Sequence, residues 1–294
     1  MLHRAADGKR ATTRAESMGS EAGRHPLPPD HAAPRRERDA LGGGPSIAES
    51  PDAVGAHLSE VLGRPIRVVV RPPARRAHHG PVLEAYDPDG RAGIVKIGET
   101  EPAREAVRHE SVVLRMLADR PLKVVMPPAV LHHGVWRDAE VLLLSTPPVR
   151  SRPFVRSRPS ADLLEAAVAE IAALDADGGH AWHGDFTPWN VTVSADGRLL
   201  VRNWARFGTG VPYGFDALHY FFHRCLRRMR PSQAAAACLA RADRLLGMST
   251  ADARRTAAHY LITIADRHLR DGHEPFGPPS EWLNPAVDHL ECLL

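Results

Sequence analysis

One short loop sequence constrains this chain more than any other feature. Residues 183–190 read HGDFTPWN, and residues 191–193 read VTV, a β-branched run typical of a short strand. An acid, Asp185, and an amide, Asn190, therefore stand five positions apart just ahead of a strand. A carboxylate in such a loop can accept the proton of an attacking hydroxyl, and an amide carbonyl can hold a metal ion. Because both residues come from one tight loop, a base and a metal held there could act on the same substrate group.

The spacing H-x-D-x-x-x-x-N, made by His183, Asp185 and Asn190, is the catalytic-loop pattern of protein kinases. With Gly184 after the histidine, it resembles the aminoglycoside phosphotransferase and choline kinase superfamily more closely, and looks most like a bacterial branch of it. The resemblance implies transfer of the γ-phosphoryl group of ATP to a hydroxyl of a small molecule. In this reaction Asp185 would be the base and Asn190 a metal ligand, with His183 as structural support.

A strand lysine and a helix glutamate form a second predicted feature. Residues 92–97 alternate as a strand does, with Lys96 inside the apolar run. Residues 101–117 have helical spacing, and Glu110 falls in the middle of the apolar face. A buried carboxylate is costly without a partner, so we expect Lys96 to pair with Glu110. The alternative is that Glu110 reaches solvent and Lys96 lies on an exposed face. The resemblance implies that the pair places Lys96 on the nucleotide phosphates.

A hairpin is predicted from two strands at residues 191–193 and 199–204, and its exit departs from the superfamily pattern. The superfamily normally reads D-W-E here, and its Asp binds magnesium, whereas residues 203–205 read NWA. Asn203 therefore takes the place of the metal-binding acid, and Ala205 that of the Glu. Farther along, Asp216 stands where the family has an acid that braces the catalytic loop. The alternative for Asp216 is an ordinary acid at a helix N-terminus.

The loop expected to cover the phosphates falls at residues 71–80, which read RPPARRAHHG. Glycines let backbone N–H groups approach phosphates, and this loop has one glycine and two prolines. We expect Arg75 and Arg76 to supply positive charge to the nucleotide instead. The sequence contains no G-x-x-x-x-G-K-[ST], which excludes the phosphate loop of nucleoside triphosphatases.

The order of elements predicts an α+β protein, and the resemblance implies a bilobal protein-kinase-like fold. Residues 1–48, rich in Arg, Ala, Gly and Pro, are expected to form a disordered N-terminal extension. Residues 49–147 would be a small, β-rich, nucleotide-binding N-lobe. Residues 148–294 would be a mainly helical C-lobe that carries the catalytic loop and a helical substrate subdomain.

Apolar periodicity and turn residues place the individual elements. Helices are predicted at 53–62, 101–117, 160–174, 216–230, 232–246, 250–269 and 284–294. Strands are predicted at 66–70, 81–86, 92–97, 127–136, 141–144, 191–193 and 199–204. Four acids near the last helices could meet a cationic substrate or form a solvated face; they are Asp266, Asp271, Glu274 and Asp288.

Net charge, cysteine number and the lengths of apolar runs limit the other classes of function that the chain could have. The net charge of +3 is too small to indicate nucleic-acid binding. The odd number of cysteines, Cys225, Cys238 and Cys292, is typical of buried thiols. No apolar run approaches the ~20 residues that span a bilayer, and the N-terminus lacks an apolar signal region. A cytoplasmic protein without a membrane partner is expected. Adjacent histidines on a strand point to opposite faces, so the pair His132-His133 is a poor metal site.

Two hypotheses remain open from the sequence. The first is a phosphotransferase that uses ATP and Mg²⁺, with Mg²⁺ binding doubtful because Asn203 replaces the acid. The second is a pseudokinase that binds a nucleotide, a metabolite or a protein without catalysis. A DNA-binding regulator would rest on scattered arginines alone. The expected partners are a nucleotide and an unidentified small molecule bearing a hydroxyl, while the acceptor and the oligomeric state are not specified by the sequence.

Overall fold

The computed structural model describes residues 50–71, 82–146, 159–175, 178–272 and 274–284. All of these belong to one compact unit, Gly44–Leu294. Several sequence predictions lie outside the described residues: the extension at 1–48, Arg75 and Arg76 in the phosphate loop, Cys292, and all but the first residue of the helix at 284–294.

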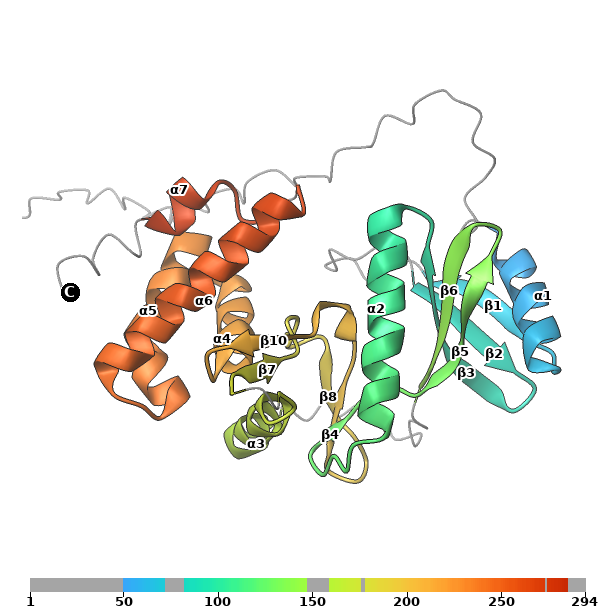
Figure 1. Ribbon diagram of the computed structural model, residues 1–294, viewed down its shortest axis with the longest axis horizontal. Helices are drawn as coiled ribbons and strands as arrows, with labels where there is room; N and C mark the ends of the chain where they lie inside the picture. Colours follow the sequence, from blue (N-terminus) through green and yellow to red (C-terminus); the bar gives the residue numbers. More distant parts are fainter. Residues whose placement is uncertain (1–49, 72–81, 147–158, 176–177, 273, 285–294) are drawn as a thin grey trace, which may run out of the picture. The chain divides into compact units, whose positions relative to one another are not determined.

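An antiparallel sheet of five strands forms the N-terminal half (Figure 1). Its strand order is β1-β2-β3-β6-β5. The strands are β1 (Arg67–Arg71), β2 (Val82–Asp87), β3 (Gly90–Gly98), β5 (Val130–Trp136) and β6 (Ala139–Ser145). Two helices accompany the sheet: α1 (Pro51–Leu62), which ends at the left-handed Gly63, and α2 (Glu101–Ala118).

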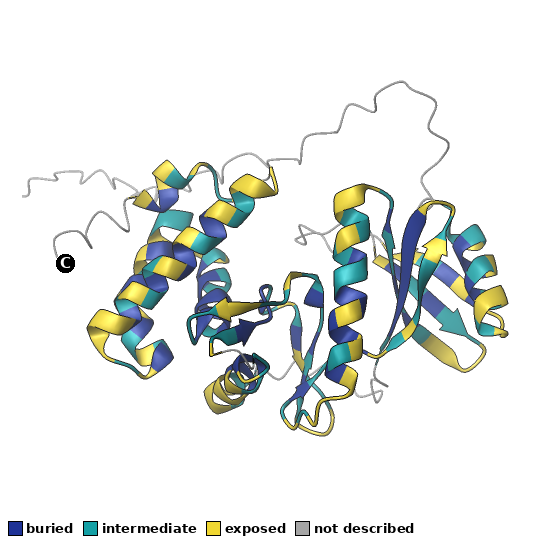
Figure 2. Cartoon of the chain, in the orientation of Figure 1, coloured by how far each residue is buried: buried dark blue, intermediate teal, exposed yellow. Residues whose placement is uncertain are grey.

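The inner strand β6, which lies between β3 and β5, is buried from Ala139 to Leu144, as the uninterrupted apolar run at residues 141–144 predicts (Figure 2). Alternate side chains of a strand point to opposite faces. Val141 and Leu143 pack with α1 in one apolar cluster, whereas Leu142 and Leu144 pack with α2 in another. The two helices therefore cover opposite faces of the sheet. Lys96 of β3 pairs in register with Leu142, and so it lies on the α2 face.

The C-terminal half is mainly helical and contributes to two small sheets, one of which also includes Val125–Met126 from the N-terminal half (Figure 1). One sheet has the order β4-β9-β8, and the other pairs β10 with β7. These strands are β4 (Val125–Met126), β7 (His180–Trp182), β8 (Val191–Val193), β9 (Leu199–Val201) and β10 (Gly208–Val211). The helices are α3 (Ala161–Ala172), α4 (Phe215–Leu226), α5 (Pro231–Leu246), α6 (Thr250–Arg270) and the short α7 (Pro279–Trp282). The predicted α+β class, with a strand-rich first half and a helical second half, is confirmed.

Several details of the sequence prediction are wrong, among them the start of the strand predicted at 127–136, which begins at Val130, and the unpredicted helix α7. The strand expected to run to Trp204 ends at Val201, and Trp204–Arg206 forms a 3-10 turn instead. The cause is the left-handed backbone of Asn203, with φ 72°, which no strand adopts. The helix expected to run to residue 230 ends at Leu226. Strands β4, β7 and β10 were not predicted, because runs of two to four residues give too little alternation to identify.

Among the described residues, no helix is long and apolar enough to cross a membrane. The two described cysteines, Cys225 and Cys238, are free and buried, as expected.

Candidate functional site

Asp216, at the start of α4, holds the first part of the loop formed by residues 183–190, which we call the HGD loop. Its carboxylate accepts hydrogen bonds from the backbone N–H groups of His183, at 2.7 Å, and Gly184, at 3.3 Å. Burial raises the pKa of Asp216 to about 7, although the two N–H donors oppose that shift. The contact predicted between this acid and the loop is therefore present.

His183 links the loop to the strand beside it. Its buried ring donates from Nε2 to the Arg202 carbonyl at 3.1 Å, and its Nδ1 accepts from the Asp185 N–H at 3.1 Å. Burial lowers the pKa of His183 to about 4, so the ring is neutral near pH 7. A neutral ring with its proton on Nε2 satisfies both contacts. The side chain thus ties the backbone at Asp185 to the backbone at Arg202.

Gly184 is required by the space around it. Its φ is 77°, and a Cβ there would lie 2.1 Å from the Arg206 carbonyl oxygen. The Gly184 carbonyl accepts a hydrogen bond from Nη1 of Arg267 at 2.6 Å. Arg267 comes from α6, and its guanidinium also lies 5.5 Å from the centre of the Trp182 ring. Nothing near Arg267 in the sequence marked it as part of this site.

Asp185 and Asn190 close the loop upon itself. Nδ2 of Asn190 donates to the Asp185 backbone carbonyl at 2.9 Å and to the carboxylate Oδ2 at 2.8 Å. The Asp185 side chain remains 22% exposed, so one face of the carboxylate is accessible.

The ion pair expected between β3 and α2 is present. Nζ of Lys96 lies 2.5 Å from Oε2 of Glu110. Glu110 is buried, and its second oxygen accepts the Trp204 N–H at 3.0 Å. The alternative, in which Glu110 reaches solvent, is wrong, because both of its carboxylate oxygens have partners.

Asn203 connects the Lys96–Glu110 pair with Asp185 of the HGD loop. Its Oδ1 accepts from Lys96 Nζ at 2.9 Å, and its Nδ2 donates to Asp185 Oδ2 at 2.5 Å. The side chains of Glu110, Lys96, Asn203, Asp185 and Asn190 therefore form one continuous chain of polar contacts. An amide suits the middle of this chain, because it accepts from a cation on one side and donates to a carboxylate on the other.

The described residues do not fit a magnesium site. Magnesium prefers hard oxygen ligands, especially carboxylates, yet Asp185 is the only carboxylate of the contact chain that faces Asn203 and Asn190. The Asn203 oxygen already faces the Lys96 ammonium, and both asparagines turn their N–H₂ groups toward Asp185. The described parts of the chain also contain no group of three or more His, Cys, Asp or Glu side chains placed to hold a metal.

Sequence reasoning also missed two residues near Asp185. His219 lies on α4 with its Nε2 3.8 Å from Asp185 Oδ1, and its Nδ1 lies 3.0 Å from the Tyr260 hydroxyl. Both rings are fully buried. The available signal was His219 itself, three residues after Asp216. Its position in the sequence is that of an ordinary residue on the apolar face of a helix.

The acids near the last helices do not gather at one site in the described chain. Asp271 forms an ion pair with Arg206 at 2.7 Å, and Asp266 and Glu274 are exposed. Asp288 lies outside the described residues.

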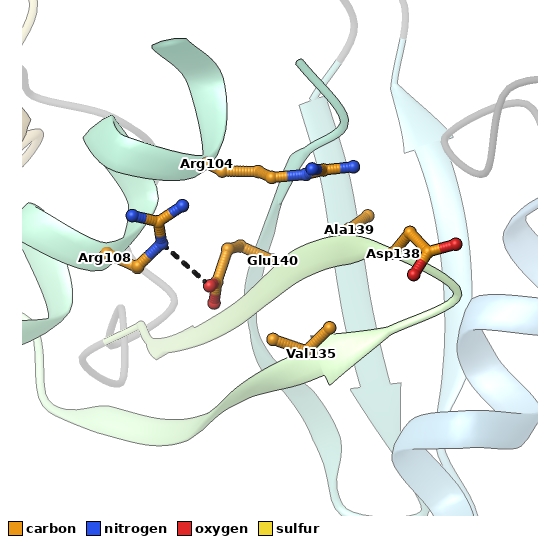
Figure 3. A pocket seen from close by; sticks show the side chains of 6 residues that line it. All are labelled: Arg104, Arg108, Val135, Asp138, Ala139 and Glu140. Carbon is orange, nitrogen blue, oxygen red and sulfur yellow. Dashed lines mark hydrogen bonds and ion pairs between the residues drawn. The ribbon is translucent and has the colours of Figure 1, made fainter. Parts of the chain in front are cut away.

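A separate small pocket lies between α2 and the β5–β6 turn (Figure 3). In it, Arg108 reaches Glu140 at 3.0 Å, while Arg104 extends across the pocket and Asp138 lies at the turn. Glu140 also contacts His133 at 2.9 Å. None of the residues predicted for the phosphotransfer site lines this pocket.

No protein-family model and no curated protein matches the sequence. Solved structures similar to this one include aminoglycoside phosphotransferase APH(4)-Ia with ADP and hygromycin B, at 15% identity and a TM-score of 0.48, covering 75% of this chain and 92% of that chain. Another is APH(2'')-IIa with gentamicin, at 11% identity and a TM-score of 0.46, covering 85% and 97%. A third is the bifunctional kinase-methyltransferase WbdD, at 17% identity and a TM-score of 0.40, covering 67% and 47%. At such identities any likeness is one of fold, and the function has to be argued from the residues of this chain.

Proposed function

We propose that this chain is an ATP-dependent phosphotransferase that acts on a hydroxyl of a small molecule. The observation that carries the proposal is the continuous contact chain from Glu110 through Lys96 and Asn203 to Asp185. It brings the half-buried Lys96, the buried Glu110 and the acid of the HGD loop into one site. A kinase needs a lysine for the phosphates and a base for the acceptor within reach of the same phosphoryl group.

The chemistry follows from the placement of these groups. Lys96, braced by Glu110, would hold the phosphates of ATP. The Oδ2 oxygen of Asp185 is occupied by two amide donors, so Oδ1 is the oxygen left to accept the hydroxyl proton. The acceptor oxygen then bonds to the γ-phosphorus, the bond to the β-phosphate oxygen breaks, and ADP leaves. Arg75 and Arg76 remain candidates for further phosphate contacts, and residues 49–147 for the nucleotide half of the site.

A second function is favoured by the amide at position 203. Asn203 removes a negative charge where magnesium would bind, and its oxygen is engaged by Lys96. A metal contributes several kcal/mol to such a transition state. A loss of ~3–5 kcal/mol would slow transfer by roughly 10²–10⁴. The alternative is therefore a slow or inactive pseudokinase that binds a nucleotide or metabolite with weak dependence on magnesium.

Isothermal titration with ATP, with and without Mg²⁺, tests nucleotide binding. The unmodified protein is expected to bind ATP with little response to Mg²⁺, and Lys96→Ala is expected to abolish binding. Lys123→Ala is the matched control, since Lys123 is the other described lysine and its side chain is exposed. Unimpaired ATP binding by Lys96→Ala would contradict the proposed site.

The substitution Asn203→Asp tests the altered metal position. It places a second carboxylate against Asp185 Oδ2, which a divalent cation would neutralise. Magnesium should therefore tighten ATP binding to this variant and raise its melting temperature more than that of the unmodified protein. If the unmodified protein already binds Mg–ATP tightly and the substitution changes nothing, Asn203 does not occupy the metal position.

A further inference from the structure

One buried ring beside Asp185 has a nitrogen that no described residue satisfies. His219 on α4 is fully buried, and its Nε2 has no hydrogen-bond partner among the described residues. This nitrogen faces Asp185 Oδ1 across 3.8 Å, which is longer than a hydrogen bond. Buried polar atoms are rarely left unpaired without a reason. The only oxygen of Asp185 that the two amides do not hold is the one that His219 faces.

The chemistry of the ring defines what Nε2 offers. Burial lowers the pKa of His219 well below its usual value, and the positive charge of Arg267 lowers it further. The ring is therefore neutral. A neutral imidazole carries one proton. A carboxylate oxygen can only accept, which favours the proton on Nε2. Nδ1 must then accept, and the Tyr260 hydroxyl, 3.0 Å away, is placed to donate to it. The contacts with Asp185 and with Tyr260 therefore favour the same tautomer.

We propose that His219 is a positioning residue for Asp185, and that Tyr260 sets the tautomer in which it acts. Tyr260 donates to Nδ1, which keeps the proton on Nε2, and Nε2–H is aimed at Asp185 Oδ1. A movement of about 1 Å closes this gap to a hydrogen bond. The carboxylate would then be held at both oxygens, by Asn190 and Asn203 on Oδ2 and by His219 on Oδ1.

The contact with His219 matters for function because it would fix the orientation of the Asp185 carboxylate. If Asn203 turns away from Asp185 to meet a nucleotide, Asp185 loses one of the donors that fix its plane. His219 then retains the carboxylate in the orientation that presents Oδ1 to the acceptor hydroxyl. This inference rests on the proposed role of Asp185 as base, but the tautomer and the contact with Asp185 can be measured without any turnover.

Nitrogen-15 NMR of the full chain labelled at histidine tests the tautomer directly. The His219 signals are assigned by their loss in His219→Gln. We expect a neutral ring protonated at Nε2 in the unmodified protein, and a mixture of tautomers in Tyr260→Phe. A proton on Nδ1 in the unmodified protein would overturn the proposal, and this result needs no variant other than the one used for the assignment.

The contact with Asp185 is tested by the same signals. Asp185→Asn is expected to shift the His219 Nε2 resonance, because the carboxylate that faces it is removed. Asp252→Asn, at an exposed acid at the start of α6, is the control and should leave this resonance in place. An unchanged Nε2 resonance in a folded Asp185→Asn variant would show that the two side chains do not interact.

Turnover gives a second readout that a purely structural role would not produce. In an assay of ATP hydrolysis, His219→Phe should lower kcat by about 10–100-fold and leave KM for ATP unchanged, since an error of ~1 Å in placement costs up to about 10²-fold. His219→Gln keeps an N–H donor near the Nε2 position and should restore most of the rate. Equal loss in both variants would contradict the positioning role. If the unmodified protein hydrolyses no ATP, the NMR result alone decides the role of His219.

Discussion

At the scale of single residues, the site depends on groups that no other residue type replaces. Asn203 is the clearest case, because its two ends meet a cation and a carboxylate. The sequence predicted its position but treated it as a weakened metal ligand. What the structure adds is that the amide bridges Lys96 and Asp185, a role that depends on which atoms it faces and cannot be inferred from residue spacing.

Gly184→Ala is a prediction at this scale. The added Cβ would lie 2.1 Å from the Arg206 carbonyl, and the residue would keep an unfavourable φ of 77°. Since the contact is with backbone, relief requires the loop to move, and we expect a loss of about 2–4 kcal/mol in the free energy of unfolding by urea titration.

Gly197→Ala is the matched control for this substitution. Its φ is 86°, but its added Cβ meets nothing within 4 Å. Gly197→Ala should therefore lower the free energy of unfolding only by the cost of a positive φ in alanine, about 1–2 kcal/mol. Equal losses for the two variants would show that the close approach to Arg206 has no energetic effect.

At the scale of elements, the sequence predicts what alternation and isolated charges reveal. The Lys96–Glu110 pair was predictable because a carboxylate interrupted an apolar helical face directly after a strand that carried a lysine. Strands β7 and β10 were not predictable, since they are short and are paired across a gap in sequence. His219 was missed for a different reason: on α4 it looks like any other core position, and only the approach of Asp185 distinguishes it.

Glu170 on α3 supports a prediction at the element scale. Its carboxylate accepts from three successive backbone N–H groups, those of Lys123, Val124 and Val125, at 2.6, 3.0 and 2.6 Å. These groups lead into β4, which pairs with β9 just ahead of Asn203. Glu170→Ala should lower the free energy of unfolding by about 2–3 kcal/mol, because the N–H groups lose a charged acceptor.

The same helix provides the control for Glu170. Glu165 is exposed on α3, and Glu165→Ala should change the free energy of unfolding by less than about 0.5 kcal/mol. If Glu170→Ala is equally mild, water replaces the carboxylate and the connection between α3 and β4 does not depend on it.

At the scale of the whole molecule, the polar groups that hold the site are buried together with several titratable side chains. Burial lowers the pKa of His183 to about 4 and that of His223 to about 2, and it lowers the pKa of His219 well below its usual value. Asp216 shifts the other way, to about 7. These four groups should therefore make the stability of the fold depend on pH, together with His57 and His132, whose pKa burial also lowers.

The sign of that dependence follows from counting protons. Between about pH 4 and 6.5, the three histidines bind protons only after unfolding, which favours the unfolded state as the pH falls. Asp216 binds its proton in the folded state over nearly the same range and so opposes them. From these four groups the net uptake on unfolding is therefore up to about two protons, which alone should lower the free energy of unfolding by up to about 2.7 kcal/mol per pH unit below pH 6.5. His57 and His132 act in the same direction as the three histidines. Urea titrations between pH 5 and 8 measure this slope, and two variants should change it in opposite directions. His223→Phe should make it shallower by about one proton, and Asp216→Asn should make it steeper by about one. A slope that both variants leave unchanged would mean that these buried groups titrate alike in the folded and unfolded chain.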